Sequence, residues 1–252
     1  MESAEGIRLN KYLSEAGVCS RREADRLIGE GLVTVDGQTA VTGMRILPSQ
    51  TVLVSGKRVT GTVKNVILAV NKPRGVVCTT DTRWGDTTLE QMVNYPTRVF
   101  GIGRLDKRSE GLILMTDNGD LVNRMMRVEN AHEKEYLVTI DRPVGEAFLE
   151  KMRAGVCLPE LQKTTLKTEA WKVDRYRFGI ILRQGLNRQI RRMCEACGCS
   201  VTKLVRVRIM NITLGDLKEG TWRELTPEEK DSLLSQLYRE TDTAKDGWEK
   251  RQ

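Results

Sequence analysis

The amino-acid sequence predicts an α+β protein, in which a small helical and β-containing domain is joined to a larger domain with one extended, mixed and mainly antiparallel sheet flanked by helices. The chain of 252 residues is long for one domain and suits two. Helix-like and β-branched runs alternate along it, and a polar, glycine-containing stretch separates its two parts. We therefore expect a small domain at residues 1–57, a linker at 58–65 and a large domain at 66–230.

Two short helices should open the small domain. Apolar residues keep helical spacing in the first helix, namely Leu9, Tyr12, Leu13 and Ala16. Ser20 and Glu23 match the S-x-x-E capping box, in which each side chain satisfies a free backbone amide, so the second helix should begin there. A β-branched run leads into the Asp36-Gly37 turn and a similar run starts at Thr51, which predicts a small sheet.

The large domain should contain alternating strands and helices. Strand-like runs occupy residues 66–70, 99–102, 112–116, 135–140, 165–173, 176–182 and 201–214. Helix-like runs occupy residues 88–93, 119–127, 145–153 and 187–197. At residues 231–252 we expect a terminal helix followed by a disordered tail, because apolar periodicity stops near residue 240.

The charge balance favours an acidic partner. Lys and Arg outnumber Asp and Glu by 41 to 34, which gives a formal net charge of +7. This excess fits a nucleic acid, although solubility alone would also explain it. The sequence has no run of about 18 apolar residues and no secretory signal, and its six cysteines are expected to be reduced thiols. We expect a monomeric cytoplasmic protein with no membrane partner.

Basic side chains gather on the two predicted helices of the small domain. They suit RNA phosphates, but acidic residues share the segment, so a merely solvated surface is an equal alternative. The run R-L-N-K-Y-L-S-E-A-G-V-C-S-R-R-E-A-D-R-L-I through G-L-V-T-V-D-G resembles the alpha-L (S4-like) RNA-binding module of a small-subunit ribosomal protein and of many RNA-modifying enzymes. The resemblance covers about residues 7–54. It implies that RNA is contacted by Arg8, Lys11, Ser20, Arg21, Arg22 and Arg26.

The most informative stretch of the large domain is the glycine-flanked segment around Asp106. The neighbouring Arg104, Lys107 and Arg108 should keep this carboxylate ionised, because nearby cations favour its charged form. A turn or capping role is the commoner use of a loop aspartate. The pattern G-R-L-D-x-x-[ST]-x-G-L-x-x-x-T-x-x-G is similar to the signature of the RsuA and RluB/E/F branch of pseudouridine synthases. The resemblance implies that Asp106 is the catalytic aspartate.

Three further segments resemble the same branch: N-K-P-R-G-V at residues 71–76, K-E-Y-L-V at 134–138, and a basic run from 183 to 208. The cations of the first segment, a strand that ends in a turn, could hold a phosphate of the substrate. By the resemblance, Tyr136 is the active-site tyrosine that stacks on an extruded base. Arg191 is expected to form the ion pair that orients Asp106, where a bidentate guanidinium would hold the carboxylate firmly. The remaining substrate-binding residues implied are Arg104, Lys72, Arg74, Leu204, Arg188, Arg192 and Arg206.

The resemblance implies that the protein turns a uridine of RNA into pseudouridine. The bond between ribose and the ring nitrogen breaks, the uracil turns, and carbon-5 is joined to the ribose, so no redox cofactor is needed. Asp106 can act covalently or remove a ribose proton, and the sequence leaves both routes open. At finer grain, the segments N-A-H-E-K-E-Y-L-V-T and V-R-I-M-N look most like a branch member that modifies large-subunit (23S) ribosomal RNA, with a tRNA as a possible second substrate.

Two other functions compete with this hypothesis. A ribosome assembly factor would use both domains only to hold RNA, and its binding would be indifferent to Asp106. A hydrolase would cleave the same bond with water and would need paired carboxylates, for which Glu110 and Asp117 are available. We expect no metal, because Cys194, Cys197 and Cys199 lack a fourth ligand and the single histidine, His132, is distant in sequence.

Overall fold

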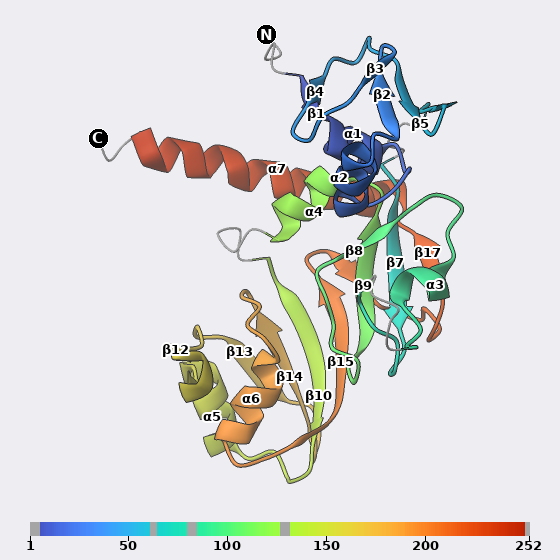
Figure 1. Ribbon diagram of the computed structural model, residues 1–252. Helices are drawn as coiled ribbons and strands as arrows, with labels where there is room; N and C mark the ends of the chain where they lie inside the picture. The colour runs from blue at the N-terminus through green and yellow to red at the C-terminus, as the bar shows by residue number, and fades with distance from the viewer. Residues whose placement is uncertain (1–5, 61–64, 80–84, 127–131, 250–252) are drawn as a thin grey trace. The chain divides into compact units, whose positions relative to one another are not determined.

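The computed structural model of the protein describes residues 6–60, 65–79, 85–126 and 132–249, with side chains up to Tyr238 (Figure 1). The chain divides into two compact units. The small unit contains residues 1–66, 96–99 and 117–119, and the large unit contains the remainder. Among the described helices, none has both the length and the apolar character that a bilayer span requires.

The small unit combines two helices with two small sheets. The helices are α1 (Leu9–Glu15) and α2 (Arg21–Gly29). The strands are β1 (Ile7–Arg8), β2 (Val33–Val35), β3 (Gln38–Thr39), β4 (Arg45–Ile46), β5 (Val52–Val54) and β6 (Lys57–Arg58). One sheet has the order β3-β2-β5-β6, and β1 pairs with β4. Apolar side chains from α1, α2, β2 and β5 form one shared core, as the periodicity predicts.

The start of α2 differs in part from the predicted capping box. The Ser20 hydroxyl accepts a hydrogen bond from the Glu23 backbone amide at 3.1 Å, so the N-cap itself is as predicted. The Glu23 carboxylate instead binds Arg26 one turn along the helix. The predicted linker also began too early, because β6 includes Arg58 and Val59 is buried in the small unit's core. Residues 61–64 of that linker lie outside the described residues.

One nine-stranded sheet organises the large unit. Its strands are β7 (Ile67–Lys72), β8 (Phe100–Ile102), β9 (Glu110–Thr116), β10 (Lys134–Ile140), β13 (Glu169–Lys172), β14 (Arg177–Leu182), β15 (Val201–Ile209), β16 (Ile212–Thr213) and β17 (Trp222–Glu224). The order along the sheet is β13-β14-β10-β15-β9-β7-β17, with β16 paired to β15 and β8 to β9. Every pairing is antiparallel except the short parallel one between β15 and β9. The predicted mixed, mainly antiparallel sheet is therefore confirmed.

Helices cover this sheet in two groups (Figure 1). The helical segments are α3 (Leu89–Val93), α4 (Gly119–Met126), α5 (Glu146–Ala154), η2 (Pro159–Leu161), α6 (Gln189–Ala196) and α7 (Pro227–Glu249), and a small hairpin joins β11 (Cys157–Leu158) to β12 (Lys163–Thr164). One core cluster joins β10 and β14 to α5 and α6. The second joins β7 and β9 to α4 and α7. The strand β15 contributes to both clusters, with Leu204 in the first and Ile209 in the second.

The C-terminal helix is longer than predicted. α7 begins at Pro227 and continues to Glu249, whereas we expected a helix from 231 and a disordered tail from about 240. It starts earlier because Thr226 and Glu229 form a reciprocal cap, with hydrogen bonds of 3.2 Å and 3.0 Å. Residues 239–249 mix Arg, Glu, Ala and Lys with Thr, Asp and Gly, so intrinsic helix propensity does not explain the extension beyond residue 238. Residues 250–252 lie outside the described chain.

Candidate active site

Asp106 lies on the loop that joins β8 to β9, where local hydrogen bonds fix its carboxylate. Its Oδ1 atom accepts from the backbone amide of Arg108 at 3.0 Å and from the hydroxyl of Ser109 at 2.9 Å. The Ser109 amide in turn donates to the Asp106 carbonyl at 3.0 Å, which closes the turn. Asp106 is therefore a turn aspartate, as the commoner use of such a residue predicts, and its second oxygen remains directed away from the turn.

Arg191 on α6 supplies the contact to that second oxygen. Its Nε atom donates to Asp106 Oδ2 at 3.3 Å, and its Nη2 atom donates to the Ser109 hydroxyl at 3.1 Å. A third bond to the Val201 carbonyl and burial to 6% exposure hold the guanidinium in place. The structure thus brings Arg191 to Asp106 as predicted, but the expected bidentate pair is wrong. One guanidinium instead bridges the carboxylate and the hydroxyl, since Ser109 already occupies Oδ1.

These contacts determine the ionisation of Asp106. Burial alone would raise the pKa of its carboxyl group. The hydrogen bond from Ser109 and the charge of Arg191 outweigh that effect, so the pKa of Asp106 lies below its ordinary value. The carboxylate is consequently anionic at neutral pH and available as a nucleophile or a base.

Lys72 has a different place from the one predicted. We expected its ammonium group to hold a substrate phosphate, but the side chain is 0% exposed. Its Nζ atom donates to the carbonyls of Pro73 at 2.8 Å and Ser109 at 2.7 Å. The prediction for Lys72 is therefore wrong, because a wholly buried ammonium cannot reach a phosphate in solvent. Lys72 instead ties the end of β7 to the loop that carries Asp106.

A cavity of about 560 Å³ opens beside Asp106 in the large unit. Seven of the predicted catalytic and substrate-binding residues line it, namely Arg104, Asp106, Tyr136, Arg188, Arg191, Leu204 and Arg206. Three do not line it: Lys72, Arg74 and Arg192. Arg74 is exposed, whereas Arg192 forms an ion pair with Glu160 and binds the Asn187 carbonyl at 3.1 Å. The volume is in the range of pockets that hold a nucleotide-sized ligand.

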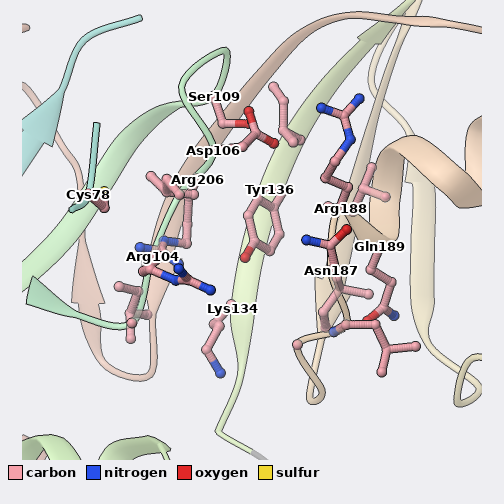
Figure 2. Close-up of a pocket in the computed structure, with 18 of the residues that line it drawn as sticks. Cys78, Arg104, Asp106, Ser109, Lys134, Tyr136, Asn187, Arg188, Gln189 and Arg206 are labelled. Carbon is pink, nitrogen blue, oxygen red and sulfur yellow. The ribbon is translucent and has the colours of Figure 1, made fainter. Parts of the chain in front are cut away.

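Tyr136 lies between Asp106 and a group of basic side chains (Figure 2). On β10 it pairs with Arg206 of β15 on one side and with Ile180 of β14 on the other. It is 9% exposed, and its ring lines the cavity. Figure 2 shows Asp106 beyond one end of the ring, and Arg104, Arg206 and Lys134 around the end that carries the hydroxyl.

Gly111 allows the two strands that carry these groups to approach. A Cβ atom at this position would lie 2.3 Å from the Arg206 carbonyl oxygen, and the backbone φ of +97° is one that other residues rarely adopt. Gly111 pairs directly with Arg206 in the parallel contact between β9 and β15. The glycine of the sequence pattern therefore sets the spacing between the Asp106 loop and the strand that bears Arg206.

Lys134 is a basic residue of this cavity that sequence reasoning did not assign to the site. Lys134 lines the cavity two positions before Tyr136, and its Nζ atom donates to the His132 carbonyl at 2.9 Å. Burial and, secondarily, the charge of Arg206 lower the pKa of Lys134 to about 8. The two-residue period of a strand places Lys134 on the same face as Tyr136, so the sequence did contain the signal.

The predicted RNA-contacting residues of the small unit differ in whether they already bind other protein groups. Arg8, Arg21 and Arg22 are exposed. Arg26 is also exposed, but it forms ion pairs with Glu23 and Glu30. Lys11 lies 3.6 Å from Glu15, and the Ser20 hydroxyl caps α2. Three guanidinium groups of this face are therefore exposed to solvent, and no carboxylate of the described residues pairs with them.

The competing chemistries gain no geometric support. Glu110 pairs with Lys203 at 3.3 Å, and Asp117 accepts from the Val66 amide at 2.9 Å. Neither carboxylate lines the cavity, so the pair that a glycoside hydrolase requires is not assembled there. In the described part of the chain, no group of three or more His, Cys, Asp or Glu side chains is arranged to hold a metal ion.

The geometry defines a class of protein. A fixed, ionised carboxylate, an adjacent aromatic ring and several cations line one cavity, while a separate small unit exposes arginines on short helices. These features are typical of an enzyme that acts on a single nucleotide extruded from a structured RNA.

Comparison with known proteins identifies the family. The profile described as RNA pseudouridylate synthase matches residues 66–196, and the S4 domain profile matches residues 7–52. The chain belongs to the RNA pseudouridylate synthase family, and it is an RNA-modifying enzyme that isomerises uridine to pseudouridine.

Individual relatives agree with this assignment. The chain is 49% identical to the dual-specificity RNA pseudouridine synthase RluF of Escherichia coli K12 over 225 residues, which cover 88% of this chain and 77% of the relative. It is 47% identical to RluF of Salmonella typhi, with 94% and 82% covered. A crystal structure of a pseudouridylate synthase matches with a TM-score of 0.67 and 29% identity, covering 90% of this chain and all of that one.

Proposed function

We propose that this enzyme modifies one uridine of the large-subunit (23S) ribosomal RNA, with a tRNA as second substrate, and that Asp106 is its catalytic carboxylate. The observation behind the catalytic role is the Asp106 carboxylate, held by Ser109 and Arg191 at the wall of a cavity that also contains Tyr136. The relatives named dual-specificity synthases support two RNA substrates.

The target nucleotide leaves its stack and enters the cavity, where Tyr136 offers a surface for the uracil ring. The bond between C1′ and N1 breaks, and its electron pair leaves with the uracil. Asp106 then either forms a bond to C1′ or accepts the proton from C2′, and either step balances the charge. The uracil turns and carbon-5 bonds to C1′, while the bond between Asp106 and C1′ breaks in the covalent route or the proton returns to C2′ in the other. Carbon-5 then loses its proton, and N1 takes one up. Atoms and electrons are conserved, so the reaction needs no redox cofactor.

Arg191 positions the carboxylate in both routes. It is buried and held by the Val201 carbonyl, so Oδ2 has a fixed direction before RNA arrives. The exposed Arg104 and Arg188 lie at the cavity wall, where their guanidinium groups suit the phosphates of the extruded nucleotide. Leu204 packs in the same cavity and provides an apolar contact for the base.

The small unit supplies RNA affinity in this proposal. Its exposed Arg8, Arg21 and Arg22 suit backbone phosphates, which supply most of the sequence-independent binding energy. Residues 66–230 form the catalytic part. We expect a monomeric enzyme, and the free cysteines suit a cytoplasmic one.

The test compares wild type with Asp106→Asn on unmodified 23S ribosomal RNA and on total unmodified tRNA. Pseudouridine is mapped by carbodiimide-stopped reverse transcription. We expect one new stop in 23S RNA and one in a tRNA with wild type, and none with the variant. Asn keeps the size of Asp106 and the hydrogen bond to its Oδ1 position but removes the charge.

Binding is measured in parallel, because an assembly factor would bind RNA equally well in both forms and leave no stop in either. That outcome would overturn the proposed activity on these RNAs. A variant that still modifies RNA would overturn the role of Asp106 alone. A stop in only one class of RNA would remove the other from the substrate list.

A further inference from the structure

The end of the cavity away from Asp106 contains a guanidinium group with an unused donor. Arg206 is 3% exposed, and its Nε atom donates to the Leu112 carbonyl at 2.6 Å. Its Nη2 atom is buried and has no hydrogen-bond partner among the residues that the structure describes. A buried donor without an acceptor costs free energy, and a charged donor costs more than an uncharged one. Because Arg206 lines the cavity, a ligand is the available source of an acceptor.

A second cation stands beside this donor. Lys134 lines the same cavity, and the charge of Arg206 contributes to the lowered pKa of its ammonium group. Its one described hydrogen bond goes to the His132 carbonyl, so further N–H donors remain for a ligand. Two positive groups that face one buried space favour an oxygen atom with negative charge there.

The position of this pair relative to Tyr136 and Asp106 indicates which oxygen it meets. Arg206 pairs with Tyr136 across β10 and β15, and Lys134 precedes Tyr136 by two residues on the same strand. Asp106 lies at the opposite end of the tyrosine ring (Figure 2). A uracil that lies along this ring with its ribose at Asp106 directs its far edge, which carries O4, toward Arg206 and Lys134.

We propose that Arg206 and Lys134 bind O4 of the extruded uracil and thereby select uridine over cytidine. This inference rests on the proposed placement of the ribose at Asp106. Uracil presents an acceptor at position 4, whereas cytosine presents an amino group that donates. The cytosine amino group is a donor facing two cationic donors, so neither the base nor the protein gains a hydrogen bond. A site built to hydrogen-bond one substrate group strongly rejects an analogue that cannot form that bond.

The same contact strengthens during the reaction. When the bond between C1′ and N1 breaks, the electron pair that N1 receives is delocalised onto O2 and O4 of the uracil. The positive groups at O4 therefore interact more strongly with the departing base than with the bound nucleotide, which lowers the barrier as well as selecting the substrate.

The experiment uses a 23S RNA fragment around the mapped uridine, made with either uridine or 4-thiouridine at that position and tritium on carbon-5. Tritium release reports the reaction. Sulfur is a weaker acceptor than oxygen, so wild type should react more slowly with the thio substrate, by about 10-fold. Lys134→Met and Arg206→Met should lose about 10–100-fold in kcat/KM on uridine, and their preference for oxygen over sulfur should fall to within about 2-fold.

Lys172→Met is the matched control, because Lys172 is exposed on β13 of the same sheet and does not line the cavity. It should keep both the rate and the preference of wild type. Lys134→Met keeps the test valid if Arg206→Met fails to fold.

The outcomes separate the inference from the function on which it rests. Variants that slow both substrates by the same factor would show a purely structural role and overturn the inference while the enzyme remains active. No release from either RNA by wild type would overturn the proposed substrate and this inference together.

Discussion

The two ends of the active-site cavity differ in how completely the protein satisfies their charges. At one end, both carboxylate oxygens of Asp106 are engaged by Ser109, Arg191 and a backbone amide. At the other, Arg206 retains a buried donor without a described acceptor, and Lys134 lies beside it. The first end is organised before RNA binds. The second is completed by the base.

This difference distinguishes charged residues that hold other protein groups in place from charged residues that bind the substrate. A buried cation whose nitrogen atoms all donate to protein groups, such as Arg191 or Lys72, holds a loop or a neighbouring carboxylate in place. A cation with donors to spare offers them to the substrate. The same distinction applies to Arg26 and Arg21 in the small unit, because in the described part of the chain Arg26 is paired with carboxylates and Arg21 is not.

Substitution of Arg191 should have the largest effect on activity, because it removes the ion pair at the Asp106 end of the cavity. We expect Arg191→Gln to lower kcat by about 100-fold, because Asp106 loses its orientation. Burial would then act on the carboxyl group without the opposing charge, so the pKa of Asp106 should rise. Activity depends on the ionised form, so the acid limb of the pH–rate profile should move to higher pH. Single-turnover rates between about pH 4 and 8 measure both effects.

Stability provides a check on the same ion pair. In wild type the pKa of Asp106 is lower in the folded state than in the unfolded one, so its contribution to stability is present above the unfolded pKa and is lost as pH falls through the folded pKa. Arg191→Gln should weaken this dependence. Arg177→Gln, which removes an exposed partner of Asp174 outside the cavity, should leave the pH–rate profile unchanged. An unshifted acid limb in Arg191→Gln would show that Arg191 does not control Asp106.

Gly111→Ala should force apart the strands that carry the two ends of the cavity. The added methyl group meets the Arg206 carbonyl oxygen at 2.3 Å, at a φ of +97°. The strands β9 and β15 must then part, and we expect the free energy of unfolding to fall by about 3 kcal/mol in urea titrations. Gly185→Ala is the control, because a Cβ there meets nothing within 4 Å. Equal stability of the two variants would contradict the proposed close contact.

Lys72→Met tests whether the buried Lys72 only positions the Asp106 loop and does not bind RNA. Loss of its bonds to the Pro73 and Ser109 carbonyls should destabilise the protein by about 1–2 kcal/mol and lower kcat, since the Asp106 loop loses its anchor. The Kd for RNA should stay within about twofold of wild type. Arg74→Met, at an exposed neighbour, should leave stability unchanged. Weaker RNA binding by a Lys72→Met variant of unchanged stability would instead support the phosphate contact that the sequence predicted.

Local patterns predicted most of the elements. The helix expected at 187–197 is α6 at Gln189–Ala196, and the strand expected at 135–140 is β10 at Lys134–Ile140, because apolar periods of helix and strand are explicit in both. The early start of α7 was also predictable, since Thr226 and Glu229 have the spacing of a capping box. In the segment 165–173 only Glu169–Lys172 form the strand β13, since strand ends depend on pairing partners.

The site was harder to predict wherever a residue's environment comes from distant segments. Lys72 stands in a polar, proline-containing turn, and its burial depends on the Ser109 carbonyl, 37 residues away. The unused donor of Arg206 and the proximity of Lys134 depend on the pairing of β10 with β15. Asp106, Tyr136 and Arg191 were found because the family pattern already records their distant contacts, which the period of a single strand or helix does not.

The smallest effect is expected for arginines of the small unit, where cations with and without a carboxylate partner among the described residues can also be compared. Arg21→Gln and Arg22→Gln should each weaken 23S RNA binding by a few fold and reduce the slope of log Kd against log salt by about 1. Arg26→Gln should change the slope less, because its guanidinium already compensates Glu23 and Glu30, and exposed pairs of this kind add little to stability. Binding titrations at several salt concentrations give the three slopes. Equal slopes for Arg26→Gln and Arg21→Gln would show that RNA displaces these carboxylates, and the distinction between engaged and available cations would then hold only inside the cavity.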